Sequence, residues 1–559
     1  MTCPQASPER PVHGSDAHRG AADVLIRGGW IVDGSGSQRF RGDVAVVGDR
    51  IVGVGNARWS ASVVIDARDM IVAPGFIDSH IHSELAILEP SGMEASTRQG
   101  VTTHIVGQDG FGFAPADVAT LRFMTTYLSG IYGRPVPFGP GGIGSFLLTF
   151  DRQTTVNVAT LIPHGCVRMM VAGNAPGALS TDALRMACEL VEQGMAQGAL
   201  GVSTGLDYVP SMYASTEELV AFGRVVSQYG GVYVSHIRYA AGAVSALKEA
   251  IEVGRRAGVP VHVSHLYGDS HAESNELLAL VDSALLRGID ITFDTYPYAY
   301  PSTILATALP GWAFEGDLDA IRNRLLDKEV RARLRTSIDL GQSLWSEARI
   351  AGFLDAPYQF ALGKDVLTAA SGAGLDPVDL ACELLLTHDF AVTLVWKRRD
   401  EQESLDDLGR FLCHQVHMLC SDGIFSPGIV HPRGYGAFAR YLGRQPREGL
   451  MRLEDAVRHA TLSPARRFHL RDRGLIAAGM VADLVVFDPM TFSDRADDNT
   501  GTRVADGVKD VLVGGTAVLR GGIPTGERPA RSILRDERAR DVTHDGQFGE
   551  SSPATRGLR

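Results

Sequence analysis

Two histidines one residue apart, His80 and His82, stand at the end of the strongly apolar segment 73–82. Alternate side chains of a β-strand point to the same face, so both imidazoles project from one side. Neutral imidazoles placed in this way bind zinc and similar divalent metals. The pair therefore predicts a metal site at a strand end, where a bound ion activates water for hydrolysis.

Three further polar residues end apolar segments later in the chain, namely His236, His265 and Asp422. His262 precedes His265 by three positions, so it faces the other side of a regular strand and is expected to pack in the core. Each position alone is typical of a hydrogen-bonded polar residue. In a barrel, however, catalytic groups come from the carboxyl ends of different strands. The recurrence therefore predicts that these residues converge on one metal site.

The elements that must position these residues alternate between strand-like and helix-like over about residues 73–470. Helix-like segments and the strands that follow them are 181–197 and 201–203, 216–228 and 231–236, and 243–257 and 259–265. Such alternation is typical of parallel βα units. It predicts an α/β fold with a TIM-like (β/α)8 barrel. Residues of about 311–390 exceed an ordinary βα loop and predict a mostly helical insertion.

Short strands separated by glycine turns occupy residues 23–72 and recur in 471–535. Chain ends often lie close together, so the two pieces are expected to form one small β-sandwich domain beside the barrel. Residues 1–22 and 536–559 are polar and predict a disordered leader and a flexible tail. The leader lacks the apolar core of a secretory signal.

The composition excludes several classes of protein. The 559 residues include 53 Lys+Arg and 65 Asp+Glu, a net charge of −12, with 45% hydrophobic residues. This balance argues against a disordered chain and against nucleic-acid or anionic-membrane binding, and no apolar run approaches the ~18–20 residues of a membrane span. The six cysteines form no disulfide pattern, which favours a cytoplasmic location with reduced thiols. The sequence leaves assembly into a homo-oligomer open.

Taken together, these segments resemble the amidohydrolase superfamily, and more closely its N-acyl-D-amino-acid deacylase (D-aminoacylase) family. The segments that carry the resemblance are 73–82, 100–103, 201–206, 235–238, 296–298, 421–423, 431–433 and 482–489. They run in order from about residue 23 to residue 535, although single segments are shared with dihydroorotases and hydantoinases. The resemblance implies a β-sandwich with a metal-dependent barrel and a small-molecule N-acyl amino acid as the substrate.

The resemblance also implies a set of metal ligands. It assigns His236 and His265 to a tightly bound zinc ion, and His80 and His82 to a second, weaker metal position. The family commonly bridges the two with a cysteine, where this chain has Asp109. A carboxylate is a good zinc ligand, so Asp109 is expected to take that place. The exchange of sulfur for oxygen leaves open the identity of the metal and the choice between one and two ions.

The same resemblance implies catalytic and substrate-binding roles. Asp422 matches the family's general base, which takes a proton from the activated water and delivers it to the leaving amine. Arg433 matches the residue that holds the substrate carboxylate, and a planar guanidinium suits that bidentate contact. Tyr296, Ser302 and Tyr208 match supporting hydrogen-bond positions.

Three functions are compatible with these residues. The expected activity is hydrolysis of N-acyl-D-amino acids to a carboxylate and a free amino acid. The alternative is hydrolysis of cyclic amides, imides or lactones, as in hydantoinases and dihydroorotases. Asp109 keeps that alternative open, as does Tyr267, which stands where family members often carry lysine, whereas Arg433 favours the linear substrate. A catalytically inactive scaffold is least favoured, because such proteins typically lose metal ligands.

Overall fold

The computed structural model of the chain describes residues 20–56, 58–338, 342–352, 357–396, 401–497 and 501–535. The expected leader 1–22 and tail 536–559 lie outside the described residues, with the exception of Gly20, Ala21 and Ala22. These three begin strand β1 (Gly20–Ile31) and pair in parallel with the start of β4 (Trp59–Asp66). Ala22 is buried in a small apolar cluster that Trp59 covers, and this burial explains why the strand begins before the expected boundary.

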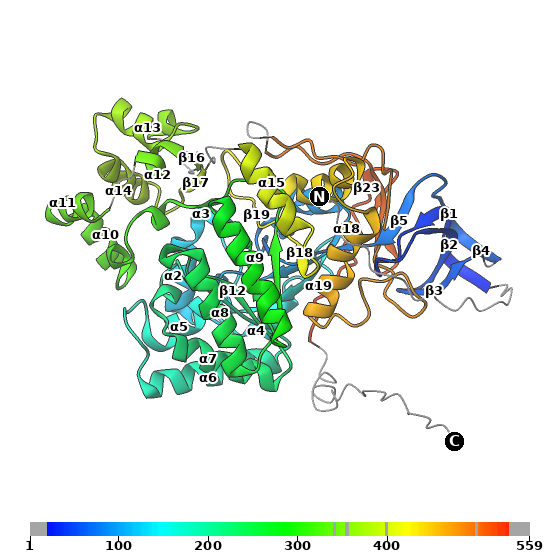
Figure 1. Ribbon diagram of the computed structural model, residues 1–559, viewed down its shortest axis with the longest axis horizontal. Helices are drawn as coiled ribbons and strands as arrows, with labels where there is room; N and C mark the ends of the chain where they lie inside the picture. The colour runs from blue at the N-terminus through cyan, green and yellow to red at the C-terminus, as the bar shows by residue number, and fades with distance from the viewer. Residues whose placement is uncertain are drawn as a thin grey trace, which may run out of the picture.

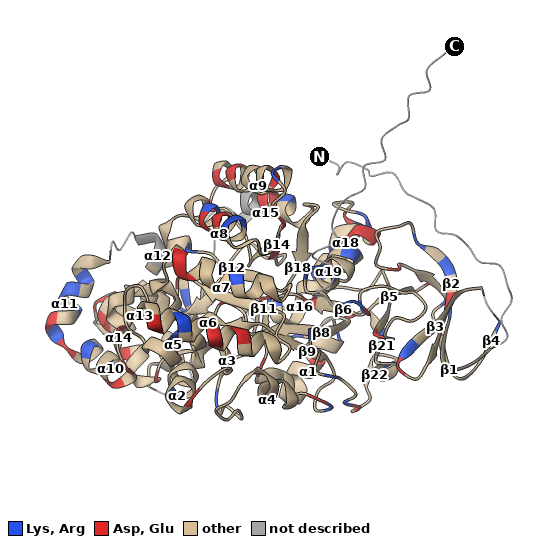
Figure 2. Cartoon of the chain, turned by 90° about the horizontal axis from the view of Figure 1, so that it is seen from below, with Lys and Arg blue, Asp and Glu red and all other residues tan. Residues whose placement is uncertain are grey.

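Strands from the two ends of the chain form one nine-stranded sheet, in the order β23-β22-β21-β20-β5-β1-β2-β3 with β4 beside β1 (Figures 1 and 2). Its other strands are β2 (Phe40–Val47), β3 (Arg50–Gly55), β5 (Ile71–Pro74), β20 (Leu484–Phe487), β21 (Val508–Val513), β22 (Thr516–Arg520) and β23 (Ile523–Pro524). The two ends meet where β5 pairs antiparallel with β20. Ile26, Val44, Val486 and Leu512 from both ends share one buried apolar cluster. Each such side chain contributes about 1.5–3 kcal/mol when buried, so this cluster stabilises the contact between the ends.

Parallel strands lie in the middle of the molecule, in the three sheets β6-β8-β9, β10-β11-β12-β13-β14-β18 and β19-β7. They are β6 (Phe76–Asp78), β7 (Ile81–His82), β8 (Val101–Val106), β9 (Asn157–Thr160), β10 (Ile162–Pro163), β11 (Gly201–Gly205), β12 (Val232–His236), β13 (Val261–Val263), β14 (Ile291–Thr295), β18 (His417–Leu419) and β19 (Gly423–Ile424). The pairs β6 and β7, β9 and β10, and β18 and β19 are nearly continuous along the chain. Each sheet therefore passes into the next through one chain segment, and the carboxyl ends of all these strands lie at the same end.

Helices cover the outside of the parallel strands (Figure 1). They are α1 (Pro90–Thr97), α2 (Val118–Tyr127), α3 (Ser129–Tyr132), α4 (Ile143–Leu148), α5 (His164–Ala172), α6 (Thr181–Ala196), α7 (Thr216–Gln228), α8 (Ala243–Ala257), α9 (His271–Leu286), α15 (Glu401–Leu412), α16 (Arg433–Ala439), α17 (Gln445–Arg447), α18 (Leu453–His459) and α19 (Leu462–Arg467). The expected helix 243–257 is confirmed as α8. It buries Leu247, Ala250 and Gly254 at helical spacing and ends at Gly258, whose φ of 63° suits glycine.

A group of elements around the expected insertion lies at the end of the molecule opposite the nine-stranded sheet (Figure 1). It contains β15 (Ser302–Ile304), α10 (Leu318–Leu326), α11 (Lys328–Ser337), α12 (Gln342–Glu347), β16 (Ala348–Gly352), α13 (Val366–Ala373), α14 (Pro377–Thr387) and β17 (Thr393–Trp396). The prediction of a mostly helical insertion at about 311–390 did not include strand β16, which pairs antiparallel with β17. This short strand directly follows α12, so the sequence pattern offers no turn signal to separate the two.

Among the described residues, no helix is both long enough and apolar enough to cross a bilayer.

Candidate metal centre

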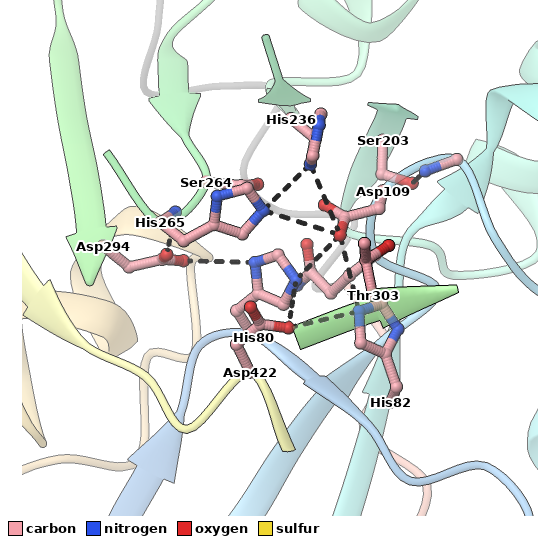
Figure 3. A network of polar contacts seen from close by, with 12 residues as sticks. His80, His82, Asp109, Ser203, His236, Ser264, His265, Asp294, Thr303 and Asp422 are labelled. Atoms are coloured by element: carbon pink, nitrogen blue, oxygen red, sulfur yellow. Dashed lines mark hydrogen bonds and ion pairs between the residues drawn. The ribbon is translucent and has the colours of Figure 1, made fainter. Parts of the chain in front are cut away.

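His80 and His82 lie at the carboxyl end of the first parallel strand segment, where the chain passes from β6 into β7. Both side chains are buried, and their rings meet at 78° with centroids 5.3 Å apart. The Nε2 atom of each ring lies 3.4 Å from Oδ2 of Asp109. The two imidazoles therefore face one carboxylate oxygen, as Figure 3 shows.

Asp109 follows strand β8 and stands between the two halves of the centre. Its Oδ2 also lies 3.8 Å from Nδ1 of His236, at the end of β12, and 3.6 Å from Nε2 of His265, just after β13. These two histidine nitrogens are 3.0 Å apart. Asp109 consequently belongs to both groups that are able to hold a metal ion: one with His80, His82 and Asp422, the other with His236 and His265.

Asp422 precedes β19 and completes the first group. Its Oδ1 is 3.4 Å from Nε2 of His82 and 3.7 Å from Nε2 of His80, and its backbone N–H donates to the carbonyl of His80 at 2.8 Å. Asp422, Asp109 and His265 have φ values of 48°, 55° and 35°. Non-glycine residues in this left-handed region are strained, and such strain concentrates at functional sites.

Several buried polar atoms of the centre have no hydrogen-bond partner among the described residues: Nδ1 and Nε2 of His80, and Oδ1 of Asp109. Buried polar atoms are nearly always satisfied, so the unsatisfied Nε2 of His80, which faces Oδ2 of Asp109 and Oδ1 of Asp422, requires an explanation, whereas Nδ1 of His80 faces Asp294 at 3.7 Å. A divalent cation in the group of His80, His82, Asp109 and Asp422 would satisfy this Nε2, and imidazole nitrogen with carboxylate oxygen is a donor set that zinc accepts. The residues present therefore fit a metal ion.

The charges of the centre are mutually stabilised. Burial raises the pKa of Asp109, but the charge of His80 and the close contacts with His265 and His80 outweigh burial and hold it well below its usual range. Burial lowers the pKa of His80, yet Asp109 and Asp294 raise it well above its ordinary value. For Asp422, burial is outweighed by the Arg433 guanidinium and by His80, so its pKa falls to about 2. The carboxylates are therefore ionised at neutral pH.

The expected substrate-binding residues lie beside Asp422. Nη1 of Arg433 is 2.8 Å from Oδ2 of Asp422, its Nη2 donates to the carbonyl of Ser302 at 3.2 Å, and its guanidinium lies 4.6 Å above the ring of Tyr296. The guanidinium is buried. The hydroxyl of Ser302 is used within the sheet, where it donates to Leu394 at 3.0 Å.

Three tyrosines complete the surroundings of the centre. The ring of Tyr208 packs edge-on against His236 at 4.9 Å, and its hydroxyl shares a 2.9 Å hydrogen bond with Thr303. Tyr267 stacks on Tyr239 with centroids 5.1 Å apart, and Tyr239 in turn meets the ring of His236 at 84°.

The sequence patterns did not identify the residues that contact the histidines, directly or through Tyr132, on the side away from the metal centre. Asp294, in β14, accepts a hydrogen bond from the backbone N–H of His265 at 2.6 Å and another from Nε2 of His262 at 2.8 Å. Glu84 accepts from the hydroxyl of Tyr132 at 3.1 Å, and that hydroxyl lies 3.4 Å from Nδ1 of His82. Like Asp422, Asp294 lies at the end of an apolar strand segment, so the same pattern in the sequence could have identified it.

His164, at the start of α5, is part of a buried ion cluster next to the loop that carries Asp109. Its Nε2 is 2.9 Å from Oε1 of Glu218, while Nη1 of the buried Arg168 is 2.5 Å from Oε2. The backbone N–H of Gly165 donates to Gly110, which follows Asp109. The cluster therefore supports the loop that carries Asp109.

Replacement of Glu218 by glutamine is expected to lower the free energy of unfolding by about 3–5 kcal/mol at pH 7, because it leaves the buried Arg168 charge unpaired. Contacts with His164 and Arg168 outweigh burial and lower the pKa of Glu218. A lowered pKa stabilises the fold above the unfolded value of about 4.3, and this contribution is lost as the pH falls through the folded value. The difference between wild type and variant should therefore shrink below pH 4.

Denaturant unfolding of both proteins at pH 7 and pH 3.5 measures this difference. The control is Glu217→Gln, since Glu217 is the exposed neighbour that pairs with Arg256 on the surface, and it should change little. A Glu218→Gln variant as stable as wild type at pH 7 contradicts the expectation.

Known proteins are similar to this chain along nearly its whole length. A family model described as "Amidohydrolase family" matches residues 63–519. An N-acyl-D-glutamate deacylase of Alcaligenes xylosoxydans xylosoxydans is 34% identical over 520 residues, which cover 92% of this chain and 97% of that protein. A D-aminoacylase of the same organism is 32% identical over 531 residues, covering 92% and 98%. The crystal structure of N-acyl-D-glutamate deacylase from Bordetella bronchiseptica, complexed with zinc and a phosphonate inhibitor, matches with a TM-score of 0.76 at 31% identity, covering 92% of this chain and 100% of that one.

Proposed function

The chain belongs to the amidohydrolase family, within it to the N-acyl-D-amino-acid deacylases, and from this premise we propose that it is a metal-dependent hydrolase of N-acyl-D-amino acids. The products are a carboxylate and a free D-amino acid. One observation carries the proposal: a buried set of imidazole and carboxylate donors lies directly beside a buried guanidinium. The donors suit amide hydrolysis, and the guanidinium suits a substrate that bears a carboxylate.

Zinc is the proposed cofactor. His236 and His265 with Asp109 would hold one ion, and His80 and His82 with Asp109 would form the second position. Two neutral imidazoles and a carboxylate are ligands that zinc takes in catalytic sites. A zinc ion bound there supplies a Lewis acid for the scissile carbonyl and lowers the pKa of a water molecule toward about 7.

Asp422 is the proposed general base and acid. Its Oδ2 is held by Arg433, whereas its Oδ1 faces the two histidines, so Oδ1 is the atom placed to receive a proton from the attacking water. The same oxygen then delivers the proton to the leaving amine. Arg433 binds the substrate carboxylate, with Tyr296, Ser302 and Tyr208 around it.

The architecture proposed for this function is a (β/α)8 barrel over residues 73–470, into which the segment of about 311–390 is inserted. Residues 23–72 and 471–535 form the accompanying β-sandwich domain. The parallel sheets that pass into one another support the barrel, and the β5–β20 pair supports the joint domain. None of the five cysteines in the described part forms a disulfide bond, which supports a cytoplasmic location.

Metal analysis followed by substrate turnover tests the proposal. The metal content of the purified protein is measured first, and then the turnover of N-acetyl-D-methionine, N-acetyl-L-methionine and a hydantoin. We expect metal-dependent hydrolysis of the D-enantiomer. A metal-replete protein that is inactive on every acylamino acid would overturn the proposal, and turnover of the hydantoin alone would replace it with the cyclic-amide alternative.

Removal of the Asp109 carboxylate is expected to weaken the affinity for zinc at least 10-fold and to abolish turnover with it, because Asp109 serves both groups of donors. Zinc stoichiometry and affinity of Asp109→Ala are measured by chelator competition. Asp109→Cys is the matched variant, since a thiolate is also a zinc ligand and should restore binding. Unchanged zinc stoichiometry and activity in Asp109→Ala would remove Asp109 from the ligands.

A further inference from the structure

Asp207 lies in the loop after strand β11, and nothing in the sequence patterns assigns it a role. Its Oδ2 is 3.2 Å from Nε2 of His236, and its Oδ1 accepts the backbone N–H of Ala240 at 3.1 Å. The side chain is only 17% exposed. One oxygen of the carboxylate thus meets a ligand histidine, while the other is fixed to the turn after β12.

The two nitrogens of His236 face different surroundings. Nδ1 points to His265 and Asp109, whereas Nε2 points to Asp207. A neutral imidazole carries its proton on one nitrogen only, and a carboxylate hydrogen-bonded to the other side of the ring determines which. With Nε2–H donated to Asp207, the lone pair of Nδ1 is directed at the group that includes Asp109.

The remaining neighbours of this imidazole are aromatic. The rings of Tyr208 and Tyr239 meet it edge-on at 63° and 84°, with centroids 4.9 Å and 5.3 Å away. These contacts restrict the tilt of the ring but do not distinguish its two nitrogens. Asp207 does, because its charge favours a proton on Nε2.

We infer that Asp207 is a positioning residue that holds His236 with Nδ1 toward Asp109 and His265, and thereby sets the affinity of this group for a divalent cation. The inference rests on the proposed metal-dependent function and extends it to a residue outside the ligand set. Carboxylates that fix a ligand histidine in this way typically change metal affinity 10- to 100-fold when they are removed.

Zinc affinity of the metal-depleted protein tests this inference, with Zn²⁺ alone as the probe and a chelator as the competitor. For Asp207→Ala we expect an increase in Kd of about 10- to 100-fold. For Asp207→Asn the increase should be smaller, since the amide oxygen still accepts Nε2–H but carries no charge. The matched control is Asp282→Asn, because Asp282 makes a similar 3.1 Å contact with Nε2 of His414, outside the centre. Its zinc Kd should equal that of wild type.

Two further readouts separate positioning from a general structural role. The unfolding midpoint of the metal-free variants should stay near that of metal-free wild type, and saturating zinc should restore most of the turnover. A wild-type zinc Kd in both Asp207 variants would overturn the inference. So would a loss of zinc affinity in Asp282→Asn equal to that in Asp207→Asn. The zinc Kd does not depend on substrate, so weakened binding in a protein that hydrolyses no acylamino acid would contradict the proposed function and leave this inference standing.

Discussion

Asp422→Asn should lower kcat/KM for an N-acyl-D-amino acid by about 10³- to 10⁴-fold, the upper part of the range for loss of a general acid–base group. An asparagine at this position keeps the shape of the side chain and the backbone hydrogen bond to His80. It removes the basic Oδ1 that faces His80 and His82. Both proton transfers of the proposed reaction use this atom, so the loss should fall mainly on kcat.

The measurement compares steady-state kinetics of wild type and Asp422→Asn after zinc content has been equalised. Asp282→Asn serves again as the control, because it exchanges the same carboxylate for an amide away from the centre. A variant that holds wild-type zinc and keeps more than a tenth of the activity would show that another group carries the proton.

Arg433→Lys should lower kcat/KM for N-acetyl-D-methionine by about 30- to 1000-fold, which corresponds to about 2–4 kcal/mol for a buried charge contact. The guanidinium is buried over Tyr296 and already donates to Ser302, so its fork is held in one orientation. A lysine ammonium is a point charge that does not reproduce the bidentate geometry. The effect should appear chiefly in KM, since the carboxylate is distant from the bond that breaks.

Arg433 also contacts Asp422. The effect of its substitution on binding of the substrate carboxylate therefore has to be distinguished from an effect on the general base. N-acetyl-D-methioninamide, which lacks the carboxylate, provides this separation. Wild type should prefer the acid strongly over the amide, and Arg433→Lys should lose most of that preference. An equal loss on both substrates would assign Arg433 to the support of Asp422 instead of to recognition of the carboxylate.

The convergence of several site residues could be predicted, because parallel strands run in one direction and their carboxyl ends meet. His80, His236 and Asp422 all end apolar segments, and parallel strands bring their carboxyl ends to one side. The antiparallel pairing of β5 with β20 emerged only from the structure, but a joint β domain of the two chain ends was likewise expected, since both ends carried the same pattern of short strands. These features depend on local periodicity, which the sequence contains.

The rest depends on contacts between distant loops, which spacing does not reveal. Asp207 reaches His236 from the preceding strand's loop, and Glu84 acts through Tyr132, 48 residues away. The contact between Arg433 and Asp422 was not expected either, since the resemblance assigned Arg433 only to the substrate. Such contacts are set by how loops fold over the ends of the strands.

The antiparallel joint between β5 and β20 has a consequence for biosynthesis. The two strands are separated by about 410 residues. At a translation rate of about 5–20 residues per second, β20 leaves the ribosome roughly 20–80 s after β5. During this interval the nascent β5 presents an unpaired edge, and unpaired edges are sites of intermolecular strand addition. Completion of the sheet is therefore among the last steps of maturation, and until then the emerging N-terminal strands are exposed to pairing with other chains.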